Sequence, residues 1–268
     1  SMPNSFNCTF NVKTRFESYN WNILNIDGHN HDEITKAIFE AKISSKPTLI
    51  CSKTKIGFGS PNKEATSSSH GSPLGKEEID LTRKSLNWDH EEFAIPDQLL
   101  YEWRSFANRN LDTKKNWENK NKEFLNSVKF NNFFDSKLNP KLKEEIVNFK
   151  NKFGDDETKY ATRKASEKSL ELLNNHIENF IGGSADLTGS NNTKTKEMTV
   201  FNAENYKGNY IYYGVREHGM AGIMNGLALH GGIRAYGGTF LVFSDYCRPS
   251  IRLSALMKLP VVYVMTHD

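Results

Sequence analysis

Three ionisable side chains, Arg216, Glu217 and His218, stand together at the start of an otherwise apolar segment. They follow the aromatic and β-branched run 210–213, and the residues after them are rich in Gly, Ala, Met and Leu. The pattern predicts a buried strand, a charged turn and a closely packed helix. It concentrates groups suited to acid–base chemistry where water is excluded. One such charge is usually a solvated helix cap, but the three together favour a functional site.

A second candidate is the segment 182–191, where two adjacent glycines are followed by small polar residues. We expect the strand 180–181 to end before them. Glycine lets a ligand approach the backbone, and Ser, Thr and Asp supply compact hydrogen-bonding groups. A Gly-Gly turn by itself is weak evidence, since many connections between helices and strands contain one.

Two further features are interpreted as structural when they are taken alone. His70 lies in the polar loop 54–73, which leaves a predicted parallel strand on the side where open α/β sheets bind ligands. A lone loop histidine is nevertheless most often solvated. Phe240, Phe243 and Tyr246 recur at three-residue spacing, and such an aromatic stripe is ordinarily part of a domain core.

The elements that position these residues alternate between strands and helices. The strand 22–26, the helix 32–42 and the strand 48–53 form one βαβ unit, which implies a parallel sheet. Residues 76–153 have apolar side chains at helical spacing among charged and Asn-rich stretches, which predicts a helical linker without chemistry of its own.

A second sheet unit is expected from a helix near 160–173 to a fully buried apolar strand at 259–265. The fold class is therefore α/β, with parallel sheets and flanking helices in two domains that a helical linker joins. Both domains are expected to be incomplete. One βαβ unit makes no sheet domain, and no helix follows the final strand, which His267 and Asp268 close. We expect the sequence to be an internal part of a longer protein.

The composition excludes several classes of protein. Hydrophobic residues make up 37% and charged residues 25% of the 268 residues, and the net charge is +3. Without a concentrated basic block we expect no nucleic-acid partner. No apolar run is long enough to span a bilayer, so no membrane partner is expected. Cys8, Cys51 and Cys247 are widely spaced and odd in number, which is typical of reduced thiols in a cytoplasmic protein rather than of disulfides or a zinc site.

Seven short motifs, in chain order, carry a family resemblance over residues 15–268. They are Ile56-Gly57-Phe58-Gly59-Ser60, His70-Gly71-Ser72-Pro73-Leu74, Ala161-Thr162-Arg163-Lys164, Gly182-Gly183-Ser184-Ala185-Asp186-Leu187-Thr188 with Ser190-Asn191, Tyr213-Gly214-Val215-Arg216-Glu217-His218, Gly237-Gly238-Thr239-Phe240 and Thr266-His267-Asp268. Together they resemble transketolase, and their number and order make the match far more specific than a single motif.

The resemblance implies a thiamine diphosphate enzyme that is a homodimer, with each active site between two subunits. Residues 1–128 would be the C-terminal part of the pyrophosphate-binding domain plus helical linker. Residues 129–268 would be linker and the N-terminal part of the pyrimidine-binding domain. The family's Gly-Asp-Gly metal motif is absent from the sequence. Ligands of the expected Mg²⁺ ion are therefore predicted outside this chain, and no metal ligand is assigned within it.

The resemblance also implies roles for individual residues. Glu217 would be catalytic, bonding N1′ of the cofactor's aminopyrimidine ring so that proton transfer there activates the thiazolium carbon. His70 would also be catalytic, handling protons of substrate hydroxyls. The cofactor-binding residues would be Asp186, Phe240, Phe243, Tyr246 and Ile56, and the substrate-binding residues Arg163, Ser190, His267 and again His70.

The activity implied is transfer of a two-carbon ketol unit from a ketose phosphate such as xylulose 5-phosphate to an aldose phosphate, in the pentose phosphate pathway. A dihydroxyacetone synthase-like enzyme is an alternative, because it shares most of these motifs. Another alternative is that the piece is a catalytically inactive fragment of a transketolase. We expect no ketol transfer by the 268 residues alone, since the metal motif is missing.

Overall fold

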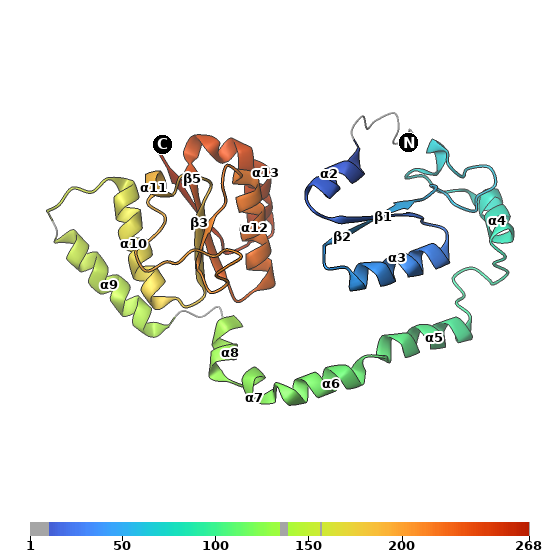
Figure 1. The fold of residues 1–268 in the computed structure, drawn as a ribbon, viewed down its shortest axis with the longest axis horizontal. Coiled ribbons are helices and arrows are strands. Elements are labelled where there is room, and N and C mark those ends of the chain that lie inside the picture. The colour runs from blue at the N-terminus through green and yellow to red at the C-terminus, as the bar shows by residue number, and fades with distance from the viewer. Residues whose placement is uncertain (1–10, 135–138, 156, 268) are drawn as a thin grey trace. The chain divides into compact units, whose positions relative to one another are not determined.

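The computed structural model describes residues 11–134, 139–155 and 157–267 (Figure 1). Cys8 and Asp268, both named above, lie outside the described residues. The chain divides into two compact units, Ser1–Arg109 and Asn110–Asp268, and each is described by itself. This division reflects compactness within the chain, so the predicted domain boundary at 128/129 stays a prediction.

The first unit contains the predicted βαβ arrangement. Two strands run parallel with Asn22 opposite Thr48, and the helix between them is capped by the Asn30 side chain, which accepts from two backbone N–H groups. A short 3-10 turn and one helix then follow the second strand. The elements are α2 Val12–Ser18, β1 Asn22–Asp27, α3 His31–Ile43, β2 Thr48–Lys53, η1 Ser67–Ser69 and α4 Lys76–Ser85.

Helices dominate the next part of the chain, as the spacing of its apolar residues predicts. They are α5 Asp97–Asn108, α6 Leu111–Lys120, α7 Lys122–Leu125, α8 Val128–Phe134 and α9 Pro140–Gly154. Asn139 caps α9 through its side chain, and Pro140 occupies the first turn, where proline costs no helical hydrogen bond. Among the described residues, no helix combines the length and the apolar character needed to cross a bilayer.

The second unit is a parallel sheet with the strand order β4-β3-β5-β6 and helices around it (Figure 1). The chain passes from β3 to β4 on one side and then returns to β5 on the other, so the order reverses between β3 and β5. Its elements are α10 Thr162–His176, β3 Phe180–Ser184, α11 Thr188–Asn191, β4 Tyr210–Tyr212, α12 Glu217–His230, β5 Arg234–Phe240, η2 Leu241–Phe243, α13 Ser244–Leu256 and β6 Val262–Thr266.

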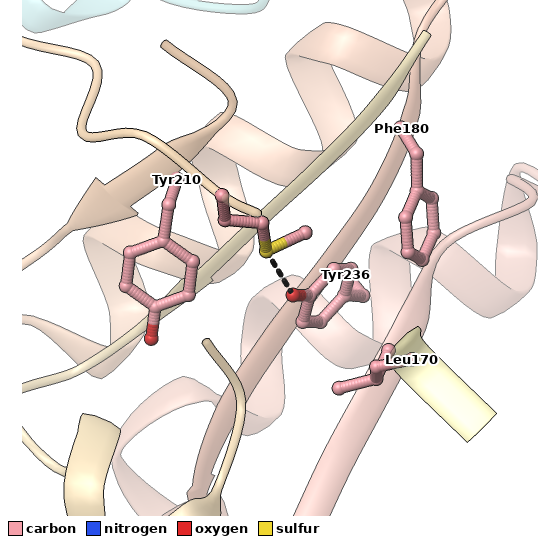
Figure 2. Close-up of a cluster of buried hydrophobic side chains, with 5 residues drawn as sticks. Leu170, Phe180, Tyr210 and Tyr236 are labelled. Atoms are coloured by element: carbon pink, nitrogen blue, oxygen red, sulfur yellow. Dashed lines mark hydrogen bonds between the residues drawn. The ribbon is translucent and has the colours of Figure 1, made fainter. Parts of the chain in front are cut away.

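The core of this unit consists of two buried clusters. One contains Leu170, Phe180, Met198, Tyr210 and Tyr236, shown in Figure 2. The other contains Ala185, Tyr213, Met220, Met224 and Ala235. Tyrosines contribute to both clusters because each ring is largely apolar. The Tyr236 hydroxyl donates to the backbone carbonyl oxygen of Thr193.

The two adjacent glycines lie inside β3 and make room for these tyrosines. A Cβ atom on Gly182 would lie 2.0 Å from Cζ of Tyr236, and one on Gly183 would lie 2.3 Å from Cε2 of Tyr213. Both glycines are buried. The prediction that the strand ends before them is therefore wrong, because close ring packing, rather than a ligand, requires glycine at both positions.

The last strand differs from its prediction as well. β6 is Val262–Thr266 and stands at one end of the strand order, with Val262 56% exposed and the next three residues half-buried. Its apolar composition alone suggests complete burial, which the described chain does not provide. Pro249 lies within α13, which continues through it.

Candidate functional site

The carboxyl ends of β3 and β5 form the reversal point of the sheet in the second unit. In open α/β sheets this is where ligands bind, since the loops after the two strands lead away in opposite directions. Asp186 follows β3, and Ser190 lies in the short helix α11 just beyond it. Both side chains are exposed, and Asp186 has a positive φ of 61°. Topology thus brings both predicted residues to one edge of the sheet.

Four predicted site residues form a continuous row of rings at this edge. The rings of Phe240 and Phe243 stack with centroids 5.6 Å apart, and those of Phe243 and Tyr246 stack at 5.8 Å. The imidazole of His267 lies against Phe240, with centroids 4.1 Å apart. Tyr246 remains 64% exposed. Phe240 and Phe243 are half-buried, so the Tyr246 ring is the most exposed member of the row.

Glu217 lies in the first turn of α12, which begins at the same edge because it follows the carboxyl end of β4. The side chain is only 7% exposed. Within residues 11–134, 139–155 and 157–267 no side chain or backbone group donates a hydrogen bond to its carboxylate. Burial, and after it the negative charge of Glu217, raises the pKa of the Cys247 thiol. The carboxylate oxygens are not among the fully buried side-chain atoms that lack a partner, so the carboxylate keeps access to a ligand at this edge of the sheet.

The neighbours of Glu217 have structural contacts. Arg216 donates from Nη1 to the carbonyl oxygen of Tyr213 at 3.0 Å, which closes the turn before the helix. Nδ1 of His218 lies 3.3 Å from the hydroxyl of Ser250 on α13. These two residues hold the start of α12 in place and leave Glu217 as the chemically available member of the triplet.

A buried polar chain links β3, the short helix α11 and β6 at the same edge, and no role is predicted from the sequence for Ser184, Asn191 or Thr266. Asn191 accepts from the Ser184 hydroxyl at 3.0 Å and donates from Nδ2 to the Thr266 hydroxyl at 2.5 Å. The hydroxyl of Thr266 lies 2.9 Å from Nδ1 of His267. Asn191 and Thr266 do occur within recognised motifs, but nothing in the sequence links positions 75 residues apart.

Arg163 is exposed in the first turn of α10. That helix leads into β3 through residues 177–179 and packs on the sheet through Leu170, so its start lies toward the carboxyl ends of the strands. Among the described residues, no side-chain contact links Arg163 to the ring row or to Glu217. The structure therefore brings it to the same side of the sheet, but not into contact with the other candidates.

The first unit holds the remaining predicted residues, Ile56 and His70, in one folded loop after β2. The Ile56 carbonyl oxygen accepts from the backbone N–H of Ala65 at 2.8 Å. Ile56 is half-buried, and His70 ends the 3-10 turn with an exposed side chain. The ring of His29 stacks on Phe58 with centroids 3.9 Å apart and accepts from the backbone N–H of Lys55.

Glu78 on α4 anchors this loop, and no role is predicted for it from the sequence. Its buried carboxylate accepts from the hydroxyl of Ser60, from the backbone N–H of Asn62 at 2.8 Å and from Nδ2 of Asn62 at 2.9 Å. The hydrogen bond from Ser60, followed by those from Asn62, lowers the pKa of Glu78 from 4.5 to about 2. The charged form is therefore the one that holds the loop.

Two other observations bear on ligands. No group of three or more His, Cys, Asp or Glu side chains in the described part of the chain is placed to hold a metal ion. A cavity of about 940 Å³ lies away from the candidate residues, at the amino ends of β3 and β5, and is lined by Phe130, Phe133, Leu142, Ile177 and Arg234 among others. The chemically equipped edge is the opposite one, so we assign the site there rather than to the cavity.

Comparison with known families gives two adjacent matches. Residues 4–156 match the family model "Transketolase, thiamine diphosphate binding domain", and residues 158–268 match "Transketolase, pyrimidine binding domain". The chain is 46% identical over 256 residues to a transketolase of Cereibacter sphaeroides, covering 96% of this chain and 39% of the relative. It is also 46% identical over 268 residues to a transketolase of Bacillus subtilis (strain 168), with the same coverage of 96% and 39%.

Solved structures agree with this assignment. A transketolase from Leishmania mexicana superposes with a TM-score of 0.84 at 31% identity, covering 98% of this chain and 40% of that one. A transketolase from Pichia stipitis, in complex with sedoheptulose 7-phosphate, superposes with a TM-score of 0.82 at 34% identity, covering 97% and 40%. The predicted α/β fold with parallel sheets and flanking helices is thus confirmed as the thiamine diphosphate-binding fold.

The chain spans about 39% of the length of the curated relatives it matches. Both of its matched segments fall in domains described for one family, and together they account for nearly every residue. The chain therefore belongs to the transketolase family.

Proposed function

We propose that the protein containing this chain is a transketolase, which moves a two-carbon ketol unit from a ketose phosphate to an aldose phosphate. The observation that carries the proposal is the pairing of the buried Glu217 carboxylate, which lacks a donor among the described residues, with a row of accessible rings at the same sheet edge. Family membership supplies the chemistry that such a pairing serves.

The residues at this edge fit thiamine diphosphate. A carboxyl group without a donor is what the N1′ nitrogen of an aminopyrimidine requires, and the faces of Phe240, Phe243 and Tyr246 suit a flat heteroaromatic ring. When bound, the cofactor supplies the electron sink for cleavage of a carbon–carbon bond next to a carbonyl group. Glu217 holds and shares the proton at N1′, and its burial keeps water from competing for that proton.

The remaining residues act around this centre. We propose that Arg163 and Ser190 bind the substrate phosphate, since a guanidinium offers a planar fork of donors to phosphate oxygens. His267, in contact with Phe240, would join them around the sugar phosphate. His70 would handle hydroxyl protons, while Asp186 and Ile56 would contact the cofactor.

Magnesium and assembly also belong to the proposal. Because the family's Gly-Asp-Gly motif is absent from the sequence, the ion that accompanies the diphosphate would be bound by residues outside this chain. We propose a homodimer with active sites between subunits. In support, α12 exposes Gly222, Gly226 and the apolar side chains of Ile223 and Leu229, which are 49% and 58% exposed. The boundary near residue 128 between the two parental domains is part of the same proposal.

We further place the protein in the cytoplasm and in the pentose phosphate pathway. Cys51 and Cys247 are free thiols, which suits a reducing compartment. Sugar phosphates of five to seven carbons are the substrates that pathway supplies to a ketol transferase.

Product analysis tests the function. The complete protein would be supplied with thiamine diphosphate, Mg²⁺ and xylulose 5-phosphate, with either ribose 5-phosphate or formaldehyde as acceptor. A seven-carbon ketose phosphate formed from ribose 5-phosphate supports the proposal. Dihydroxyacetone formed from formaldehyde, without transfer to ribose 5-phosphate, would favour the dihydroxyacetone synthase alternative instead.

The chain of 268 residues is proposed to be inactive by itself. It lacks the metal motif and the described residues hold no metal-binding group. The same assay applied to the purified 268 residues should detect no transfer. Turnover under these conditions would overturn this part of the proposal.

A further inference from the structure

We propose that Asn191 and Thr266 are positioning residues for His267, so that one buried amide sets the orientation of a substrate-binding imidazole. The inference rests on the proposed function for the role of His267. The hydrogen-bonded chain itself, from Ser184 through Asn191 and Thr266 to His267, is given by the structure.

The side chain of Asn191 is built into the sheet edge rather than lying on it. Asn191 and Ser184 are fully buried, and Thr266 is 6% exposed. A Cβ atom on Gly238 would lie 3.3 Å from Oδ1 of Asn191, so the amide lies over the backbone of β5. It spans from β3 on one side to β6 on the other. Both ends of the amide are hydrogen-bonded, with Oδ1 toward Ser184 and Nδ2 toward Thr266.

The last hydrogen bonds in this series, at Thr266, determine how His267 is held. Nδ2 of Asn191 donates to the Thr266 hydroxyl, so the hydroxyl hydrogen of Thr266 is available for donation to Nδ1 of His267, 2.9 Å away. The neutral imidazole then carries its hydrogen on Nε2, on the opposite side of the ring. That hydrogen is a donor for an oxygen atom of the sugar phosphate.

The backbone adds a reason for such support. His267 has a positive φ of 59°, as do Asp186 at 61° and Asn192 at 52°, all at this edge of the sheet. This left-handed conformation costs free energy in residues other than glycine. The hydrogen bond from Thr266 and the contact with Phe240 hold His267 in that conformation. Without them the ring loses its fixed place beside the ring row.

The same amide also fixes the residues that flank it. Asn191 directly follows Ser190, and its backbone N–H donates to Leu187 at 2.8 Å. The Ser184 hydroxyl accepts from the backbone N–H of Leu187, the residue after Asp186. The buried residues Ser184, Asn191 and Thr266 therefore connect candidate residues of two segments, Asp186 and Ser190 after β3 and His267 after β6.

The test uses the complete protein and substitutions that differ by single groups. Thr266→Val removes the hydroxyl with almost no change of shape, and Thr266→Ser keeps the hydroxyl. Asn191→Ala removes the amide. Thr195→Val is the matched control, because Thr195 is 1% exposed and its hydroxyl has no hydrogen-bond partner among the described residues.

We expect Thr266→Val and Asn191→Ala each to lower kcat/KM for a phosphorylated donor by about tenfold to a hundredfold, the scale of a misplaced substrate group. Thr266→Ser should restore activity, and Thr195→Val should leave it unchanged. The double variant Asn191→Ala/Thr266→Val should have a kcat/KM no lower than that of the less active single variant, since both substitutions act through one path. In a His267→Ala background, Thr266→Val should cost nothing further. The inference would be refuted if the losses of kcat/KM in the double variant were additive. It would also be refuted if Thr266→Val lowered kcat/KM in the His267→Ala background as much as it does in the unsubstituted protein.

A second readout separates this inference from the proposed function. Nitrogen NMR of the His267 ring should show the hydrogen on Nε2 in the unsubstituted protein and loss of that preference in Thr266→Val. A hydrogen fixed on Nδ1, or a ring state indifferent to Thr266→Val, would overturn the inference whether or not the protein transfers ketol units. If Asn191→Ala fails to fold, the Thr266→Val and Thr266→Ser pair decides the question by both readouts.

Discussion

Replacing Gly182 by alanine should be one of the most destabilising single-methyl additions possible in the second unit. The new Cβ would lie 2.0 Å from Cζ and 2.1 Å from Oη of Tyr236, where an ordinary contact between heavy atoms needs about 3.5–4 Å. The ring cannot withdraw easily. It is 1% exposed and packs against Phe180, with centroids 4.8 Å apart.

The magnitude follows from two separate losses. Forcing an extra carbon into a filled core costs about 1–3 kcal/mol. A displaced ring also breaks the hydrogen bond from the Tyr236 hydroxyl to the carbonyl oxygen of Thr193, now 2.5 Å long, and a buried carbonyl left without a donor costs about 1–3 kcal/mol more. The sum, about 2–6 kcal/mol, is a large part of the roughly 5–15 kcal/mol that stabilises a typical domain.

Urea unfolding of the protein, followed by far-ultraviolet circular dichroism, measures this cost. With a slope of about 2 kcal/mol per molar urea, the midpoint for the second unit should fall by about 1–3 M. Gly154→Ala is the matched control, because a Cβ atom there meets nothing within 4 Å. Equal midpoints for Gly182→Ala and the control would refute the explanation of the Gly-Gly pair as space for tyrosine rings.

Three further predictions concern buried groups. The pKa of Glu78 is lowered from 4.5 to about 2, so its charged form should stabilise the loop after β2 fully above pH 4.5 and lose that effect as pH falls toward 2. An NMR titration of the Glu78 carboxyl group with a midpoint near 4.5 would contradict this. Thr239→Val should keep or raise the free energy of unfolding by up to about 1 kcal/mol, since the buried hydroxyl has no partner among the described residues, and thermal unfolding will measure it. Cys51 should be alkylated before Cys247 at mildly alkaline pH, because burial raises the pKa of the Cys247 thiol and shields it; mass spectrometry of partly labelled protein that found Cys247 modified first would contradict this.

The sequence predicts the order of elements well because local signals determine them. The strand 48–53 and the helix 32–42 that precedes it follow from the local spacing of apolar residues, and the structure places them as Thr48–Lys53 and His31–Ile43. Parallel pairing then follows from connection length, since a helix lies between the strands. These features need no knowledge of distant residues.

Packing across the sheet is not predictable in the same way. The residues that require glycine at 182 and 183 are tyrosines 54 and 30 positions later in the chain, at 236 and 213. A Gly-Gly pair therefore looks like a turn until the fold is known. The stripe from Phe240 to Tyr246 is ambiguous for a related reason: spacing shows that rings share a face, but not whether another element covers it.

In the candidate site, too, some residues are predictable from the sequence and others are brought together only by the fold. Motif order leads to Glu217, Asp186, Ser190 and His267, and topology gathers them at one edge of the second unit. The supporting polar groups carry no such signal. Asn191 meets Thr266 only because α11 lies over the end of β5, and Glu78 meets Ser60 only because α4 folds back on its loop.

Turnover of the Glu217→Gln variant tests the central claim most directly. It would be measured in the complete protein with xylulose 5-phosphate, ribose 5-phosphate and excess thiamine diphosphate, beside Glu197→Gln, which alters an exposed carboxylate of the same unit. Loss of a group that shares a proton with the cofactor should lower kcat by about 10²–10⁴-fold with little change in KM, while the control keeps full activity. An unchanged kcat for Glu217→Gln would contradict the assignment of this carboxylate to the cofactor and, with it, the proposed active site.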